Sequence, residues 1–277
     1  MPPPGRGDVS AHGRPGSALS ARGWPGPGMA ERATPCDDAG MCGRFTQQLS
    51  TSEFARIFGA EPLVDDPGGR FNVAPMRTAA VVVAKDDHRA IVAYRWGLVP
   101  SWAKDPRIGS RMINARAETI ATSPAYRASF EKRRCLVPVD AFYEWHRVGK
   151  GPSQPYVIRH ADGSPLAFAG IWSSWRDPSA PEGADPLRTF SIVTTGANGI
   201  LAPIHDRMPV ILGPDEWPLW LGTEVAGPGE VIALLRPAPE GGLVRYPVAR
   251  YVNDVRNDGP VLVEPIVLPD GPAAVQA

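Results

Sequence analysis

The stretch CLVPVDAFYEW, from Cys135 to Trp145, decides how the chain folds, because it is the longest of several apolar runs of strand length. Such runs, bounded by turn-forming residues, predict strands. Segments rich in turn residues, such as KDDH, RVGKGPSQ and HADGSP, separate most of the runs. The other runs are Ala80 to Ala84, Ile91 to Leu98, Pro155 to Arg159, Leu166 to Trp172 and Phe190 to Thr195.

Helical signals are fewer and shorter. Ser50 and Glu53 form a Ser-x-x-Glu capping box, and the apolar residues that follow share one helical face, so we expect a helix over residues 51–59. We expect further helices from Asn114 to Ala121, from the N-cap Ser123 to about Lys132, and after Pro214. Together the elements predict an α+β domain, with a curved or barrel-like sheet flanked by helices.

The composition sets limits on the class of protein. The 29 Lys and Arg residues balance the 29 Asp and Glu residues, so no bulk attraction to nucleic acid or to a membrane follows. No apolar run reaches the roughly 18 residues of a membrane span, and a secretion signal is lacking. The three cysteines, Cys36, Cys42 and Cys135, fit neither a disulfide framework nor a CxxC zinc motif. We expect a cytoplasmic protein.

The two ends of the chain differ from its middle in composition and in apolar periodicity. Residues 1–40 contain seven Pro and eight Gly and show no apolar periodicity, which predicts a disordered tail. We expect one domain over residues 41–265 and a C-terminal tail over residues 266–277.

Basic residues concentrate between Lys104 and Arg134, where eight of them accompany three acidic residues and give a local net charge of +5. A charge run of this kind is ordinarily a solvated face. Trp96 and Trp102 lie just before it, and a cationic groove with aromatic platforms suits single-stranded nucleic acid. Both tryptophans could equally be core residues, so composition leaves the two interpretations open.

Cys42 is the first candidate for chemistry, because it directly follows Met41. A buried structural role is the ordinary interpretation of a cysteine. If translation begins at Met41 and the methionine is removed, however, the mature chain begins with a 1,2-aminothiol. Its α-amine, with a pKa of about 7.7–8.0, can form a Schiff base with an aldehyde, and the thiol can then close a thiazolidine ring.

Three other residues could assist such chemistry. Glu144 interrupts the quoted apolar stretch, so it lies either on the outer face of a strand or partly buried, where desolvation would raise its pKa. His205 stands beside Asp206 and Arg207, and the ordinary histidine pKa of about 6.5 suits proton transfer in both directions. Asn114 opens the segment NARAET, where a helix N-cap would explain it without any function.

Eight ordered blocks of sequence extend over about Met41 to Asn257. They are MCGRF (41–45), RFNVAP (70–75), WGLVPSWAKD (96–105), INARAET (113–119), CLVPVDAFYEW (135–145), IVTTGAN (192–198), IHDRMPVIL (204–212) and VNDVRN (252–257). In this set the chain resembles the SOS-response-associated peptidase (SRAP) family, the family of abasic-site processing proteins. The resemblance implies the family's fold, a β-barrel-like sheet flanked by helices.

The resemblance also implies an activity and a set of catalytic residues. Family members recognise abasic sites in single-stranded DNA, and their N-terminal cysteine forms a thiazolidine crosslink with the ring-opened deoxyribose, which shields the lesion. By motif, Cys42 would be the nucleophile and Asn114 would orient the reacting centre. Glu144 would position the α-amine and move protons. His205 would assist opening of the sugar ring and, in reverse, release of the crosslink.

A second set of residues is implied to bind the DNA. Arg44 and Arg116 would hold the phosphates that flank the lesion. The residues implied to shape the cleft or contact the nucleic acid are Asn72, Pro75, Trp96 and Trp102. We expect a monomer with no metal and no organic cofactor, whose partner is single-stranded DNA.

The sequence departs from the family pattern in one place, because 41 residues precede Cys42. The explanation that we favour is that translation starts at Met41, or at Met29 with later trimming. Alternatively, the domain removes the segment itself as a thiol peptidase of class EC 3.4, using Cys42 with Glu144 or His205. Otherwise the segment stays, and the protein binds single-stranded DNA without a covalent step. The crosslinking hypothesis also allows a DNA-lyase-like activity.

Overall fold

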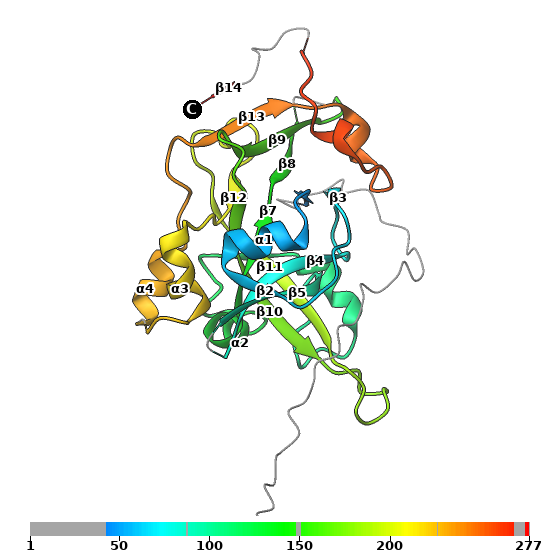
Figure 1. The fold of residues 1–277 in the computed structure, drawn as a ribbon, viewed down its shortest axis with the longest axis vertical. Helices are drawn as coiled ribbons and strands as arrows, with labels where there is room; N and C mark the ends of the chain where they lie inside the picture. The colour runs from blue at the N-terminus through cyan, green and yellow to red at the C-terminus, as the bar shows by residue number, and fades with distance from the viewer. Residues whose placement is uncertain (1–42, 87, 148–150, 226, 269–274, 277) are drawn as a thin grey trace, which may run out of the picture.

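Five strands close into a barrel in a computed structural model of the chain, which describes residues 43–86, 88–147, 151–225, 227–268 and 275–276 (Figure 1). These strands are β4 (Thr78–Lys85), β5 (His88–Trp96), β7 (Arg134–Val139), β10 (Leu166–Trp175) and β11 (Leu187–Gly196). Antiparallel pairing joins β5 to β4, β4 to β7, β7 to β10 and β10 to β11. The circle closes because β11 also pairs in parallel with β5, where Phe190 lies beside Trp96.

A second sheet of six strands extends from the barrel. In order across the sheet, its strands are β14 (Val275–Gln276), β13 (Leu243–Pro247), β9 (Gln154–His160), β8 (Ala141–His146), β1 (Arg44–Gln47) and β3 (Arg70–Val73). The quoted stretch CLVPVDAFYEW passes through both sheets, because β7 belongs to the barrel and β8 to the second sheet. Asp140 is the corner between them, and its carboxylate accepts the backbone N–H groups of Gln48 and Leu49.

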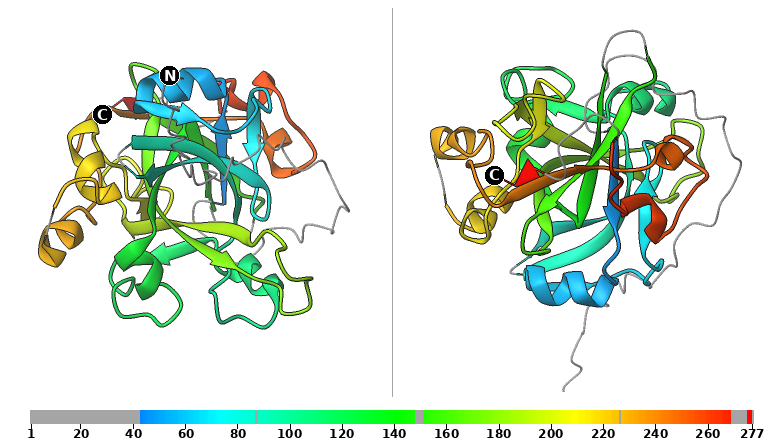
Figure 2. Two further views of the ribbon diagram at one scale, coloured as in Figure 1. Left: turned by 60° about the horizontal axis from the view of Figure 1, so that its bottom comes forward. Right: turned by 90° about the horizontal axis from the view of Figure 1, so that it is seen from above.

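Short elements surround the two sheets (Figure 2). The remaining strands are β2 (Ala60–Pro62), β6 (Asn114–Arg116) and β12 (Arg207–Pro209). The helices are α1 (Thr51–Phe58), α2 (Arg127–Lys132), α3 (Trp217–Leu221) and α4 (Pro228–Ala233). Short 3-10 helices are η1 (Pro106–Arg111), η2 (Pro214–Glu216), η3 (Arg250–Asn253) and η4 (Pro260–Val263). No helix in the described part of the chain is long and apolar enough to cross a membrane.

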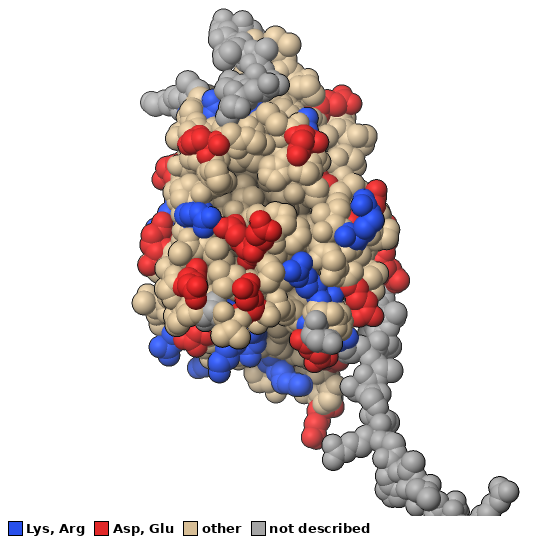
Figure 3. All heavy atoms as spheres, turned by 60° about the vertical axis from the view of Figure 1, so that its left-hand side comes forward, with Lys and Arg blue, Asp and Glu red and all other residues tan. Residues whose placement is uncertain are grey.

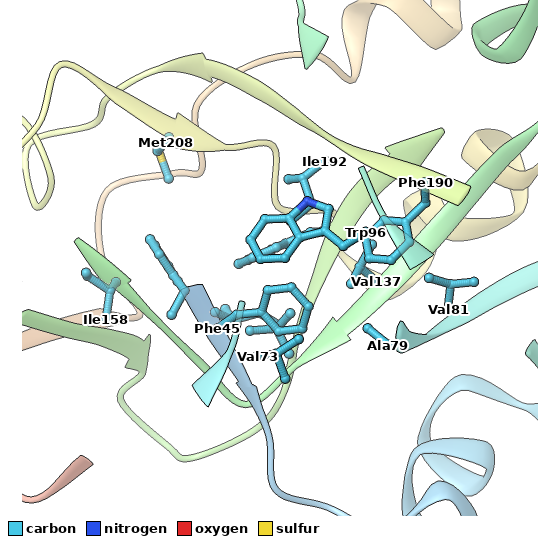
Figure 4. Packing of buried hydrophobic residues seen from close by; sticks show 14 of the residues in the cluster. Phe45, Val73, Ala79, Val81, Trp96, Val137, Ile158, Phe190, Ile192 and Met208 are labelled. Carbon is cyan, nitrogen blue, oxygen red and sulfur yellow. The ribbon is translucent and has the colours of Figure 1, made fainter. Parts of the chain in front are cut away.

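Alternate side chains of the barrel strands pack into two separate hydrophobic clusters, one inside the barrel and one outside it. On β4, Ala79 and Val81 point into the inner cluster, which also contains Trp96 and Phe45 (Figure 4), whereas Val82 points outward. The outer cluster is covered by the apolar faces of α1, α2 and α3. This alternation is what a pleated strand buried on both faces requires. The inner cluster therefore fills the barrel, and the helices cover its outer surface.

The predicted fold class is confirmed, since a barrel-like sheet is flanked by short helices. The first helix is also confirmed, because the Ser50 side chain accepts the Glu53 N–H and the Glu53 carboxylate accepts the Ser50 N–H. Each predicted strand is present, although the run from Cys135 to Trp145 is two strands. β14 lies inside the segment predicted as a C-terminal tail, and residues 1–40 lie outside the described residues.

Two helix predictions need correction. Asn114 to Ala121 is not a helix, because its first residues form β6 and pair in parallel with residues 192–194 of β11. The next helix begins only at Arg127, and its N-cap is Tyr126 without a side-chain cap. The carbonyl of Ser123 accepts the N–H groups of Tyr126 and Arg127, so Ser123 opens a turn before the helix.

The buried side chain of Gln47 joins the second sheet to the barrel. Continuation of the β4–β7 register places Ala80 opposite Pro138, which has no N–H to continue the ladder. The Gln47 Nε2 atom donates to the carbonyls of Ala80 and Pro138, each at 2.9 Å, and Oε1 accepts the Ala80 N–H at 3.0 Å. Oε1 also accepts a bond from Arg70. One amide therefore completes the ladder where proline interrupts it.

Gln47→Ala should lower the free energy of unfolding by about 3 kcal/mol, because it leaves several buried polar groups unsatisfied. Equilibrium denaturation in urea measures this change. Gln48→Ala is the matched control, since the neighbouring amide is half-buried and its side chain bonds only Thr46 among the described residues. Equal stability of the two variants would show that Gln47 does not couple the sheets.

Candidate functional site

The start of β1 lies against Glu144. β1 and β8 pair with Arg44 opposite Tyr143 and Phe45 opposite Phe142, so the register places Gly43 opposite Glu144. Gly43 is buried, whereas Cys42, the residue before it, lies outside the described residues. The chain thus reaches the predicted nucleophile directly from a strand whose register is fixed.

Glu144 is buried on the inner face of β8. Only 3% of the residue is exposed. Side chains alternate along a strand, so Glu144 shares its face with Phe142. Phe142 belongs to the inner cluster and packs edge-on against Phe168, with 5.4 Å between the ring centroids. Of the two positions left open by the sequence, the structure therefore gives Glu144 the buried one.

Asn114 approaches the same cluster from β6. It pairs with Ile192 of the inner cluster, while the next residue, Ala115, belongs to the outer cluster, so alternation directs the Asn114 side chain inward. Its backbone carbonyl accepts the hydroxyl of Tyr126 at 3.0 Å. Because Asn114 begins a strand, the helix N-cap that offered a structural explanation for it is absent.

His205 lies between a tight turn and β12. Its ring is about one quarter exposed, and Ile204 and Met208 on either side of it belong to the inner cluster. The Nδ1 atom accepts the backbone N–H of Arg207 at 3.1 Å. Burial lowers the pKa of His205 below its ordinary value, while the nearby Asp206 carboxylate opposes that shift. The neutral imidazole is therefore favoured near pH 7.

One hydrophobic cluster brings these segments together. Phe45 of β1, Phe142 of β8, Ile192 beside β6, and Met208 of β12 all belong to it. Figure 4 shows the Trp96 ring between Ile192 and Phe45, with Met208 to one side of them. The segments that carry Cys42, Asn114, Glu144 and His205 thus border a single hydrophobic core, although they are far apart in the sequence. Among the described residues, no group of three or more His, Cys, Asp or Glu side chains could hold a metal ion.

Comparison with known proteins decides the family. The family model described as SOS response associated peptidase (SRAP) matches residues 41–255. The chain belongs to the SRAP family. The family resemblance predicted from the eight sequence blocks is confirmed.

The relatives of this SRAP chain span most of its length. Abasic site processing protein YoqW of Bacillus subtilis is 36% identical over 228 residues, which cover 81% of this chain and 99% of YoqW. Abasic site processing protein YedK of Escherichia coli is 32% identical over 232 residues, covering 82% and 100%. A crystal structure of a protein from Bacteroides thetaiotaomicron matches with a TM-score of 0.70 at 25% identity, covering 82% of this chain and 100% of that one.

The residues that the SRAP resemblance assigns to DNA binding divide into exposed and buried groups. Arg116 is exposed, Pro75 is half-buried, and Trp102 is 61% exposed. Trp96 is 0% exposed, and its ring lies 4.9 Å from that of Phe45. No face of Trp96 is open to a base in this structure, so Trp96 occupies the core position that the sequence left open.

Arg44 and Asn72 form a buried clamp. The Arg44 Nη1 atom donates to Asn72 Oδ1 and to the carbonyl of Val252, each at 2.8 Å, and Nη2 donates to the carbonyl of Asn253 at 3.2 Å. Asn72 Nδ2 donates to three carbonyls of the same segment, those of Val252, Asp254 and Asn257. The clamp thus fastens residues 252–257 beside the start of β1. The sequence analysis assigned Arg44 and Asn72 to DNA binding and did not predict their contact with residues 252–257, although VNDVRN (252–257) was one of the matching blocks.

Exposed cations gather at one end of the SRAP domain. Lys and Arg side chains lie along the lower edge of the face shown in Figure 3, at the end of the molecule where Figure 1 places α2. Arg127 and Lys132 of α2 are exposed, as are Lys104 and Arg111. Other basic residues of the predicted run have structural contacts, since Arg134 donates to backbone carbonyls. The run is therefore only partly available to a polyanion.

The lowered pKa of His205 predicts a pH dependence of stability. Because the unfolded chain binds a proton at His205 more readily than the folded chain, stability is fully present above about pH 6.5 and falls as pH decreases below it. His205→Gln should reduce the slope of the free energy of unfolding against pH between about 6.5 and 5, as measured by urea denaturation.

The matched control is His88→Gln, since His88 lies at the exposed surface beside Glu61. This variant should keep the slope that His205 causes. An unchanged slope in His205→Gln would contradict the desolvation of that ring.

Proposed function

We propose that this SRAP protein processes abasic sites by forming a thiazolidine crosslink to single-stranded DNA through Cys42 as its mature N-terminal residue. The crosslink would protect abasic sites during the response to DNA damage. The observation that carries the proposal is the register of β1, which sets Gly43 opposite the buried Glu144 at the core shared by the Asn114 and His205 segments. Relatives named abasic site processing proteins support the same activity.

The reaction begins with the closed sugar. An abasic deoxyribose is mostly a cyclic hemiacetal, so the proton of its C1′ hydroxyl must leave and the ring oxygen must gain a proton before the aldehyde is exposed. The C1′ hydroxyl proton passes to a water molecule. His205 donates the Nε2 proton of its neutral imidazole to the ring oxygen, while Nδ1 accepts the Arg207 N–H, and Nε2 takes a proton back from that water, so the ring ends neutral. Burial keeps the imidazole neutral near pH 7.

Covalent bonds then form in two steps. The neutral α-amine of Cys42 attacks the aldehyde carbon, and loss of one water gives an imine. The thiol sulfur adds to the imine carbon, its proton passes to the nitrogen, and a five-membered ring closes. Glu144 accepts the proton that the amine loses and returns it to the departing water. Asn114 orients the carbon through its side-chain amide.

We assign direct DNA contacts to the exposed residues and supporting roles to the buried ones. Arg116 holds a phosphate next to the lesion, and Trp102 offers a ring for a neighbouring base. Pro75 shapes the edge of the cleft, and Trp96 supports it from within the core. Arg44 and Asn72 act through the segment that they clamp, in addition to any phosphate contact of Arg44. The protein would work in the cytoplasm, at the nucleoid when DNA is bound, and as a monomer.

Self-processing is the alternative, and the family's description as a peptidase favours it. In that case the full chain would convert itself to a product that begins at Cys42. Conversion that persists after Cys42→Ala would show that another enzyme removes the segment or that translation starts at Met41.

Protein that begins at Cys42 should form a denaturant-resistant adduct with an oligonucleotide that carries one abasic site. Its mass should equal the sum of protein and DNA less one water, as intact-mass spectrometry measures. The sharpest control keeps the thiol and adds one Gly before Cys42, because the amine becomes an amide and the ring cannot form. Cys42→Ala should also abolish the adduct, and an unchanged yield there would refute the proposal.

Arg116→Ala should weaken binding to single-stranded DNA several-fold and reduce the slope of log K against log salt by about 0.7, the value for one phosphate contact on a single strand. Its thermal stability should stay that of the wild type, because Arg116 is exposed. Arg44→Ala should instead destabilise the fold by about 3 kcal/mol through the lost clamp. Fluorescence anisotropy over a salt series and urea denaturation separate the two effects. An unaltered salt slope in Arg116→Ala would exclude its phosphate contact.

A further inference from the structure

The side chain of Arg207 crosses the end of β11. Its backbone pairs with Gly196 on one edge of that strand. On the other edge, Ala117 follows β6 and donates its N–H to the carbonyl of Thr194 at 2.9 Å. Arg207 Nη2 donates to the same Thr194 carbonyl at 2.8 Å. The guanidinium therefore reaches from β12, across β11, to the segment that follows β6.

Glu118 holds the guanidinium from the far side. Arg207 Nη2 donates to Glu118 Oε2 at 2.9 Å, and Nη1 donates to Oε1 of the same carboxylate. A planar guanidinium matches a carboxylate with two parallel bonds, which an ammonium group cannot reproduce. The bond from Arg207 is the main cause that lowers the pKa of Glu118, so the pair is ionic near neutral pH. The Arg207 side chain is 16% exposed and that of Glu118 is 54% exposed, so the pair is less solvated than an ion pair between two exposed side chains.

The backbone of the same arginine sets the tautomer of His205. The Arg207 N–H lies 3.1 Å from His205 Nδ1, so Nδ1 must accept and the neutral ring carries its proton on Nε2. An Asp206 carboxylate oxygen also lies 3.1 Å from Nδ1 and can accept from it once the ring is protonated. Three neighbours therefore act on the proton of His205: Asp206 directly, Arg207 through its backbone N–H and its charge, and Glu118 through Arg207.

We propose that Glu118 is a positioning residue for His205. It anchors Arg207 across β11, and the anchored backbone holds His205 as the Nε2–H tautomer. This inference rests on the proposed function, in which His205 protonates the ring oxygen of the sugar. Glu118 touches no reacting atom in this role. Its effect is on the geometry and the proton of the acid, and not on the binding of DNA.

The tautomer can be observed without any reaction. The chain has five histidines, so selective ¹⁵N-histidine labelling of the full chain, with His205→Gln to assign the signals, reports which ring nitrogen carries the proton. The wild type should show Nε2–H at His205. Glu118→Gln, which keeps the shape of the side chain and removes its charge, should give a mixture of tautomers. An unchanged His205 tautomer in Glu118→Gln would overturn the inference.

The rate of adduct formation is the second measurement, made on protein that begins at Cys42. Glu118→Gln should react about 10-fold or more slowly at saturating DNA, since small displacements of catalytic groups have effects of this size. Glu118→Asp keeps the charge but shortens the reach, so it should also be slow. Glu216→Gln is the matched control, because Glu216 forms a separate ion pair with Arg236 at 2.6 Å.

The outcomes separate this inference from the proposed function. A wild-type rate in Glu118→Asp would show that charge alone matters and would overturn the positioning role, as would a slow Glu216→Gln. If the wild type forms no adduct at all, the proposed function fails, while the tautomer measurement still decides whether Glu118 controls His205.

Discussion

The side-chain amide of Gln47 is the interaction on which the rest of the structure depends. Pro138 leaves the β4–β7 ladder without a donor, and a buried carbonyl without a donor is costly. Gln47 supplies both a donor and an acceptor at that point, so β1 is fixed to the barrel from outside. Because β1 is fixed, Gly43 keeps its register opposite Glu144. An apolar side chain at position 47 could fill the space but could not complete the ladder.

The sequence predicted the long strands well because they are apolar on both faces or alternate regularly. It did not predict the shorter strands that carry the site. β1 has the sequence RFTQ, with one apolar residue, since Arg44, Thr46 and Gln47 all make buried hydrogen bonds. The segment that forms β6 was predicted to be helical because Asn is a common helix N-cap and Ala has a high helix propensity. Its backbone pairs instead with β11, and pairing between distant segments leaves no local signal.

Residue type was enough to propose candidates for chemistry, but it did not predict their exposure. Cys42, Glu144 and His205 were proposed for chemistry from residue type and neighbours, and the two that the structure describes, Glu144 and His205, border one core. Residue type did not show which cations and rings face solvent. Trp96 and Trp102 are six positions apart, yet one is 0% and the other 61% exposed. Arg44 and Arg116 differ in the same way, because only tertiary packing decides whether a guanidinium binds backbone carbonyls or stays in water.

The arrangement also indicates which step of the proposed crosslinking reaction a protein can accelerate relative to a free aminothiol. A 1,2-aminothiol reacts with aldehydes without help, so the covalent steps demand mainly that amine and carbon be held close. The closed form of the sugar is the greater obstacle, because little aldehyde exists until a proton reaches the ring oxygen. A neutral, solvent-exposed histidine would be free to change tautomer, so its Nε2 would donate only part of the time. Burial of His205 favours the neutral ring, and the bond from Arg207 selects the donor nitrogen. In the proposed mechanism, the buried contacts of the site would therefore serve His205 as the acid, whereas Cys42 as the nucleophile would need only a strand that begins in the right place.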